Sequence, residues 1–156
     1  MPIHRLSEKP RIKGTLADIT CDSDGKIDHF INPKKAKNLL ELHTYNSSEP
    51  YYLGMFLVGA YQEIMGNLHN LFGNTNVAHI QLDNNSYQVK SVVEGDRIED
   101  VLNCVEYDSK SLIETMRDHT EKALQNKTIT LKEARKLLQN YVNTLNNSTY
   151  LKVEQK

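Results

Sequence analysis

A thiol and two carboxylates stand close together at Cys21, Asp22 and Asp24. The run before them, residues 15–20 (TLADIT), is rich in β-branched residues and half alternating, which predicts a strand. The Asp-Ser-Asp-Gly sequence that follows is typical of a turn. Cys21 would then lie at the mouth of a strand, where a cleft can form. These residue types suit a catalytic thiol beside a carboxylate that orients a cationic substrate.

Two other interpretations of this cluster stay open. In the first, Cys21 is a small buried hydrophobe, and the two aspartates are ordinary turn formers that cap local backbone N–H groups. In the second, Asp22 and Asp24 bind a metal ion with the spacing of an EF-hand loop. Gly25 comes too early for that loop and no bidentate Glu stands at its end, so the metal interpretation is disfavoured.

The composition bounds the class of protein. The 156 residues are enough for one domain with a small appended subdomain, and a core of that size is stable without disulfides or bound metal ions. A formal net charge of −1 marks no surface for nucleic acid, and no apolar run is long enough to span a bilayer. Cys21 and Cys104 lie far apart in sequence without a Cys/His cluster, which favours a reducing compartment and argues against structural zinc.

The first part of the chain has the pattern of short strands. Residues 1–5 predict an edge strand. Because the sequence starts within a strand, it is expected to be a fragment of a longer protein. Residues 26–31 alternate and are expected to pair with residues 15–20 as a hairpin. Residues 34–48 lie between prolines and predict a surface loop, in which His43 is a solvated polar residue.

The most apolar run, residues 51–61, predicts a buried central strand. Glycine within a strand marks a bulge or a close approach, so Gly59 and Tyr61 could bring a backbone N–H group and a phenol near an anion. Residues 62–68 predict a helical turn or two. The loop that follows carries His69, which on its own is most simply a structural histidine.

Two further patterns complete the chain. Residues 77–82 and 87–93 predict a hairpin of half-buried strands, and Asp96 with Glu99 predicts a capped short helix in which Cys104 is inert packing. The last third predicts an antiparallel pair of helices, over residues 109–125 and from Thr130 to Asn146. We therefore expect a mainly β domain of about six strands over residues 1–107 and a helical extension over residues 108–156.

Two stretches, residues 18–31 (DITCDSDGKIDHFI) and residues 51–76 (YYLGMFLVGAYQEIMGNLHNLFGNTN), together resemble the C-terminal part of the biosynthetic arginine decarboxylases. The opening MPIHRL and the segment EGDRIEDVL also fit that family, so the resemblance covers most of residues 1–107. These are pyridoxal-phosphate enzymes of the alanine-racemase-like fold type III. The resemblance implies a C-terminal β-sheet or barrel domain that completes an active site across a head-to-tail dimer. It also implies an N-terminal TIM barrel, absent here, that holds the cofactor on a lysine, so the chain alone is expected to be inactive.

The resemblance assigns two roles at the turn. Cys21 matches the family thiol that returns a proton to the substrate carbon after carbon dioxide departs, and such a donor needs positive charge nearby from the cofactor or another subunit. Asp22 matches the carboxylate that meets the distal cationic end of the substrate, where a guanidinium can form a bidentate pair. Asp24 is a second candidate for substrate binding.

The resemblance also assigns residues after the turn. Tyr61 matches the tyrosine that hydrogen-bonds the cofactor phosphate, consistent with close approach of the phosphate at Gly59. His69 aligns with a position near the site of related decarboxylases, which makes it a candidate for substrate binding.

The resemblance predicts a cytoplasmic lyase that converts L-arginine to agmatine and carbon dioxide in polyamine (spermidine and putrescine) biosynthesis. Its cofactors would be pyridoxal phosphate and, by family habit, magnesium at a site that the sequence does not locate. Its partner would be the barrel domain of the same or a neighbouring subunit in a homo-oligomer. One alternative is another basic amino-acid decarboxylase acting on ornithine or diaminopimelate, the latter disfavoured because Asp22 would repel its distal carboxylate. The other is a non-catalytic dimerisation or regulatory module.

Overall fold

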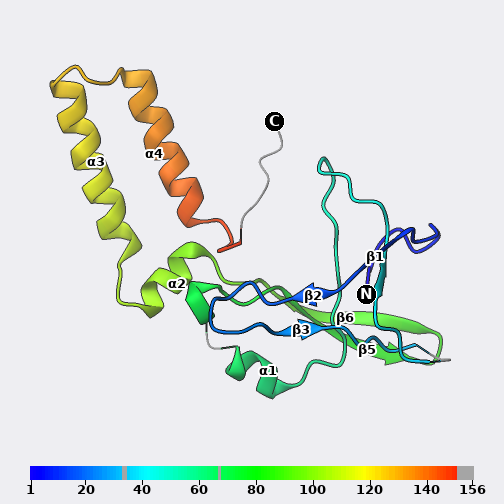
Figure 1. The fold of residues 1–156 in the computed structure, drawn as a ribbon. Helices are drawn as coiled ribbons and strands as arrows, with labels where there is room; N and C mark the ends of the chain where they lie inside the picture. The colour runs from blue at the N-terminus through cyan, green and yellow to red at the C-terminus, as the bar shows by residue number, and fades with distance from the viewer. Residues whose placement is uncertain (33–34, 67, 151–156) are drawn as a thin grey trace. The chain divides into compact units, whose positions relative to one another are not determined.

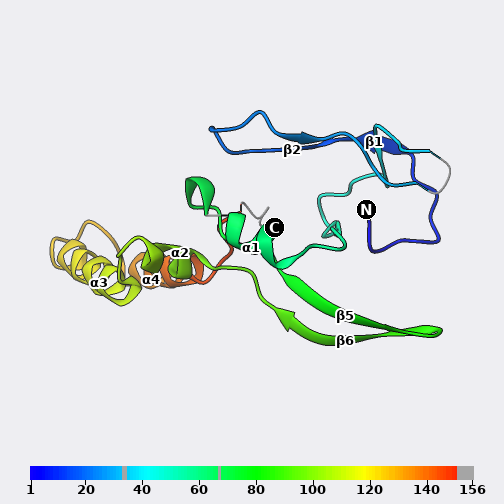
Figure 2. The same ribbon diagram turned by 90° about the horizontal axis from the view of Figure 1, so that it is seen from below.

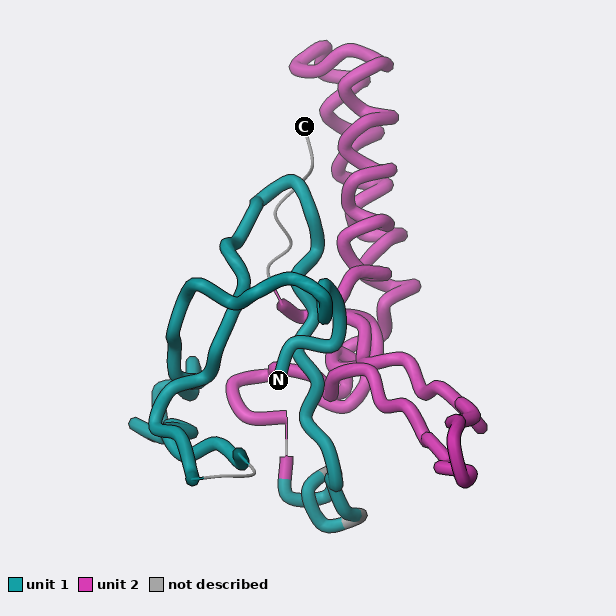
Figure 3. Tube along the Cα trace, turned by 90° about the vertical axis from the view of Figure 1, so that its right-hand side faces the viewer, with its two compact units in different colours: residues 1–65, 152–156 teal, residues 66–151 magenta. Residues whose placement is uncertain are grey.

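The computed structural model describes residues 1–32, 35–66 and 68–150. It divides into two compact units, whose described residues lie in Met1–Met65 (unit 1) and Gly66–Leu151 (unit 2) (Figure 3). Within the described part of the chain, six strands form three separate two-stranded antiparallel sheets (Figure 1). A short helix and a 3₁₀ turn lie between the fourth and fifth strands, and three described helices follow the sixth. The expected fold class, a β domain with a C-terminal helical hairpin, is confirmed, with the strands paired in twos. The division at residue 107 stays a prediction.

Unit 1 contains two of the strand pairs. β1 (Ile12–Gly14) pairs with β4 (Leu40–Leu42), and β2 (Leu16–Ala17) pairs with β3 (Lys26–Ile27). The second pair confirms the predicted hairpin, although only two residues of each strand take part. The predicted surface loop over residues 34–48 is wrong where β4 lies, because Leu40 turns into the core and is only 7% exposed.

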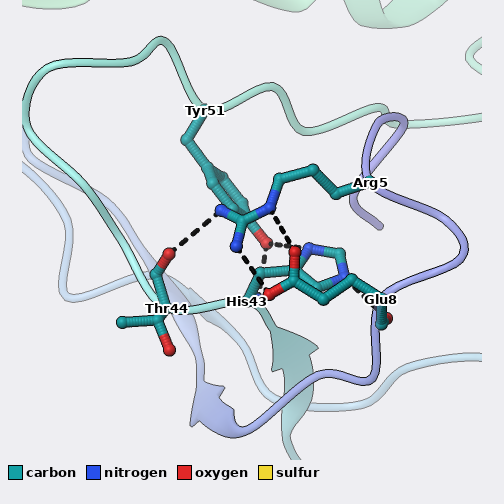
Figure 4. A network of polar contacts seen from close by, with 5 residues as sticks. All are labelled: Arg5, Glu8, His43, Thr44 and Tyr51. Carbon is teal, nitrogen blue, oxygen red and sulfur yellow. Dashed lines mark hydrogen bonds and ion pairs between the residues drawn. The ribbon is translucent and has the colours of Figure 1, made fainter.

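His43, directly after β4, is buried, and the prediction of a solvated histidine is wrong. Its Nδ1 lies 3.0 Å from the hydroxyl of Tyr51, and its Nε2 lies 3.1 Å from the backbone oxygen of Glu8 (Figure 4). The backbone N–H of His43 donates to the same Tyr51 hydroxyl at 2.8 Å. Beside this pair, Arg5 forms a bidentate ion pair with Glu8 and donates to the backbone oxygen of Thr44. A histidine whose two ring nitrogens are both partnered can be buried without an unsatisfied polar group.

The run of residues 51–61 is not a buried central strand. Leu53 forms a single β-bridge with Pro2, the only such pairing of the predicted edge strand among the described residues. Leu57 has a φ of 59° and is 97% exposed, and α1 (Ala60–Met65) begins three residues later. A central strand needs a neighbour along both edges, and a left-handed residue ends the extended conformation that such pairing requires.

The strands of unit 2 form the long hairpin of β5 (Val77–Asp83) and β6 (Ser86–Val93), which confirms the predicted pairing (Figure 2). The expected half-burial is wrong, because every residue of β6 is exposed and only Val77 of β5 is partly covered. The described residues of unit 2 offer no layer that packs on either face of this sheet.

The helices of unit 2 are α2 (Ile98–Cys104), α3 (Ser109–Gln125) and α4 (Leu131–Leu145). The predicted antiparallel pairing of α3 and α4 is confirmed (Figures 1 and 3). The buried apolar residues of this unit come from these helices: Val101, Ala134 and Leu145. The capped start of α4 is also confirmed, because the side chains of Thr130 and Glu133 bond reciprocally.

Two details of α2 differ from expectation. The carboxylate that accepts the backbone N–H of the N-cap residue, Arg97, belongs to Asp100, at 2.8 Å. Asp96 instead accepts the backbone N–H of Asn74 at 2.7 Å, so its side chain is not available to cap the helix. Cys104 is exposed at the end of the helix, and its prediction as packing is wrong. None of the described helices is long and apolar enough to cross a membrane.

Candidate functional site

The turn between β2 and β3 presents Cys21, Asp22 and Asp24 at the surface, and all three residues are exposed. The expectation of a buried cysteine, left open by the sequence, therefore does not hold. The backbone N–H of Asp18 donates to the oxygen of Gly25 at 2.8 Å and closes the base of the turn. One closed loop therefore carries the thiol and both carboxylates at the surface, where a second protein domain can contact them.

Asp18 organises this loop, and the sequence reasoning did not single it out. Its carboxylate accepts hydrogen bonds from the Oγ1 of Thr20 at 2.6 Å and from the Thr20 N–H at 2.8 Å. These bonds hold the pKa of Asp18 below its ordinary value, with a smaller contribution from Ser23. The signal was present, because an aspartate two residues before a threonine is typical of a local Asx turn.

Gly25 is required at the end of the loop by a close approach. Its N–H donates to the Oγ of Ser23 at 2.9 Å, and a Cβ on Gly25 would lie 2.9 Å from that same oxygen. Any larger residue would displace Ser23. The glycine therefore keeps the loop that carries Cys21 compact.

Gly59 and Tyr61 lie at the start of α1. The N–H of Gly59 donates to the Oε1 of Gln62 at 2.8 Å, and Tyr61 is 79% exposed. The Gly59 N–H already donates to an oxygen. A phosphate oxygen could accept the same hydrogen bond in place of the Gln62 carboxamide. With the phenol as a second donor, these residues fit the phosphate of pyridoxal phosphate in their chemistry.

His69 lies in unit 2, whereas the other candidate residues lie in unit 1. It begins η1 (His69–Leu71), a single tight turn in which His69 is exposed. Leu68, Asn70 and Leu71 have φ values of 46°, 51° and 62°, in the left-handed region that residues with a Cβ rarely adopt. The structure thus groups the candidates in three places: the β2–β3 turn, the start of α1, and η1.

The described residues contain no group of three His, Cys, Asp or Glu side chains that could hold a metal ion. Magnesium stays an expectation drawn from the resemblance.

With this geometry in place, comparison with known proteins defines the class. Residues 98–151, which contain α2, α3 and α4, match the family model described as the arginine decarboxylase C-terminal helical extension. The fold is thus that of the strand-bearing, helix-extended end of an amino-acid decarboxylase. The segment that matches the family model is this helical section, in which the sequence shows no catalytic residues.

The relatives name the family. The chain is 57% identical, over 97% of its length, to the biosynthetic arginine decarboxylase of a Nostoc species, and 56% identical to that of Thermosynechococcus vestitus. The crystal structure of the biosynthetic arginine decarboxylase of Campylobacter jejuni superposes with a TM-score of 0.69 at 34% identity, over 99% of this chain and 25% of that one. The predicted resemblance to the biosynthetic arginine decarboxylases is confirmed, and this chain is similar to one part of those proteins. It spans 22% and 24% of the length of the two curated relatives.

Proposed function

We propose that this chain is the C-terminal portion of an arginine decarboxylase that converts L-arginine to agmatine and carbon dioxide in cytoplasmic polyamine biosynthesis. The observation that carries the proposal is the 57% identity over 97% of the chain to a biosynthetic arginine decarboxylase. The geometry agrees with it, because the β2–β3 turn displays a thiol and carboxylates at the surface.

Asp22 would accept the guanidinium of arginine in a bidentate pair. In this chain Asp22 is exposed, and an ion pair open to water is weak because solvent screens both charges. Selective recognition of arginine therefore requires a second surface that excludes water from the turn. Asp24, on the same loop, would add negative charge, which opposes a substrate with a distal carboxylate.

Cys21 would donate the proton that replaces the departing carboxyl group on the substrate carbon. Its exposure on the turn leaves the sulfur accessible to a substrate held by a neighbouring domain. Pyridoxal phosphate, when bound, supplies the electron sink for the pair left at that carbon. Gly59 and Tyr61 would hold the cofactor phosphate through an N–H group and a phenol.

The β5–β6 hairpin supports a partner domain. The register pairs Ala78 with Val92, Ile80 with Val89 and Leu82 with Tyr87, and it shifts between His79 and Ile80. Residues directly opposite one another share a face, and alternate residues of one strand do too, so these six apolar side chains lie on a single face.

The shift is what makes this face continuous. Lys90 has no partner across the hairpin, because Ser91 pairs with His79 and Val89 pairs with Ile80. In a strand that alternated regularly, without this shift, Val92 would fall on the opposite face from Val89, because it comes three residues later. Leu82 is 81% exposed and Tyr87 is 68% exposed, and a lone two-stranded hairpin is marginal in water. The aligned apolar face thus requires a cover.

A second apolar surface lies in unit 1, where four consecutive apolar residues are exposed: Met55, Phe56, Leu57 and Val58. Contiguous exposed apolar residues mark interaction surfaces. We assign the cover of both surfaces to the barrel domain of the same or a neighbouring subunit, within a homo-oligomer. The chain alone is then inactive.

The experiment is complementation. This chain is co-expressed with the part of the Nostoc relative that it does not match, and agmatine formation is measured with L-arginine and with L-ornithine. We expect agmatine only when both pieces are present, and little decarboxylation of ornithine. Equal turnover of ornithine would assign the chain to a different basic amino-acid decarboxylase, and no turnover of either substrate would favour a non-catalytic module.

Cys21→Ala tests the proton donor in the same assembly, with Cys104→Ala as the matched control because that thiol is also exposed but lies on α2. Loss of a positioned general acid typically slows a reaction about 10²–10⁴-fold. We expect a loss of that size for Cys21→Ala and an unchanged rate for the control. An unchanged rate in Cys21→Ala would remove the thiol from the mechanism.

A further inference from the structure

The segment after α4, residues 147–150, folds back onto the start of unit 2, and we call it the C-terminal clasp (Figure 1). Its first residue, Asn147, accepts the backbone N–H of Ile98 at 2.8 Å, and Ser148 forms a β-bridge with Arg97. These contacts tie the clasp to the start of α2. The end of the helical extension is therefore brought to the loop that follows η1.

The clasp forms hydrogen bonds with both the backbone N–H and the backbone oxygen of Gly73. The N–H of Gly73 donates to the Oγ1 of Thr149 at 2.9 Å, and the hydroxyl of Tyr150 donates to the oxygen of Gly73 at 2.8 Å. The ring of Tyr150 also stacks on Phe72, with centroids 5.3 Å apart and planes 16° from parallel. Two adjacent residues of the η1 loop are thus fixed by two residues of the clasp.

Gly73 has no freedom to move away from these partners. It is buried, and a Cβ on it would lie 2.5 Å from the Cβ of Asp96. Asp96 in turn holds the next residue, because its carboxylate accepts the N–H of Asn74 at 2.7 Å and its own N–H donates to the Asn74 oxygen at 3.0 Å. The C-terminal end of the η1 loop is therefore locked on both sides.

The η1 turn itself needs such a lock. Leu68, Asn70 and Leu71 all have left-handed φ values, which cost free energy in residues with a Cβ and persist only where the surroundings hold them. The N–H of Phe72 donates to the oxygen of His69 at 3.0 Å, so the residue stacked on Tyr150 is also bonded to the candidate site histidine. A path of direct contacts runs from Tyr150 through Phe72 to His69.

We infer that the C-terminal clasp is a positioning device for His69: Thr149 and Tyr150 hold the strained η1 turn in the conformation that presents this histidine to arginine. The inference rests on the proposed function for its substrate, and it gives the helical extension a role at the site. Thr149 and Tyr150 are positioning residues, since they act through Phe72 and Gly73.

The first test uses the chain itself and needs no activity. Thr149→Val removes the acceptor of the Gly73 N–H, and loss of one such bond raises local opening about fivefold. We expect amide exchange at Gly73 to accelerate by that factor, and Tyr150→Phe to shift the imidazole resonances of His69. The control is Tyr141→Phe, which removes the same atom from α4. Unchanged amide exchange at Gly73 and unchanged His69 resonances would refute the inference that the clasp positions His69.

The second test uses the complemented enzyme. We expect Tyr150→Phe to raise the KM for arginine several-fold with a smaller change in kcat, and to have no further effect in a His69→Ala background. An equal rise of KM in that background would show that the clasp does not act through His69. If the assembly fails to decarboxylate arginine, the proposed function fails while the exchange and resonance measurements still decide the clasp.

Discussion

Leu145 tests how unit 2 is held together. It is the last residue of α4 and only 5% exposed, and the clasp begins two residues later. Leu145→Ala removes most of a buried side chain, and such changes cost about 2–5 kcal/mol. The same change would loosen the helix end from which the clasp extends.

Leu137→Ala is the matched control, because Leu137 lies on the same helix but is 45% exposed. It loses only part of the transfer free energy and leaves no closed cavity, so we expect a cost of about 1 kcal/mol. Both variants exchange the same residue types within one helix, so helix propensity contributes almost equally to the two. The difference in unfolding free energy therefore reports burial.

The assay is urea unfolding followed by far-ultraviolet circular dichroism, whose helical signal comes mostly from α2, α3 and α4. The midpoint should fall further for Leu145→Ala than for Leu137→Ala, with an unchanged slope if both variants unfold from the same native state. Equal losses from the two variants would show that Leu145 is not part of a closed core. The reasoning that connects the helices to the clasp through this residue would then be refuted.

Two other predictions follow from the turn and the hairpin. The pKa of Asp18 is lowered by its bonds to Thr20, so its contribution to the turn is complete above its ordinary value of 3.8 and is lost as the pH falls through the lower folded value. Acid titration of the Thr20 amide by NMR should show this transition, and Asp18→Asn should abolish it; a transition that survives would contradict the assignment. On the hairpin, Val89→Ser should weaken association with the complementing fragment in a pull-down titration, whereas Gln88→Ser, on the other face, should not. Equal weakening would mean that the apolar face is not the contact.

Local chemistry made the helices and hairpins readable from the sequence. The start of α4 follows from the reciprocal bonding of Thr130 and Glu133, three residues apart, and α3 (Ser109–Gln125) has the predicted bounds. The β5–β6 pairing follows from alternation on both sides of a short polar turn. In each case the residues that determine the structure are neighbours in sequence, so no distant contact is needed to predict it.

The candidate site could be predicted only in part. The residues that could do chemistry, led by Cys21 and Asp22, were identifiable by type, spacing and family resemblance. The residues that position them were harder to find: Asp18 had a local signal, whereas Tyr150 reaches Gly73 from 77 positions away. Spacing alone carries no trace of such a contact.

The sequence by itself determined the elements with local causes and the family resemblance, and it supplied the candidate site residues. Tertiary structure decided that His43 is buried, that residues 51–61 do not form a central strand, and that one extra residue in β6, Lys90, brings six apolar side chains to one face. It also decided that the end of the helical extension returns to the η1 turn. Each of these depends on where a distant segment lies, because burial, strand pairing and register are properties of two segments together and neither segment specifies them alone.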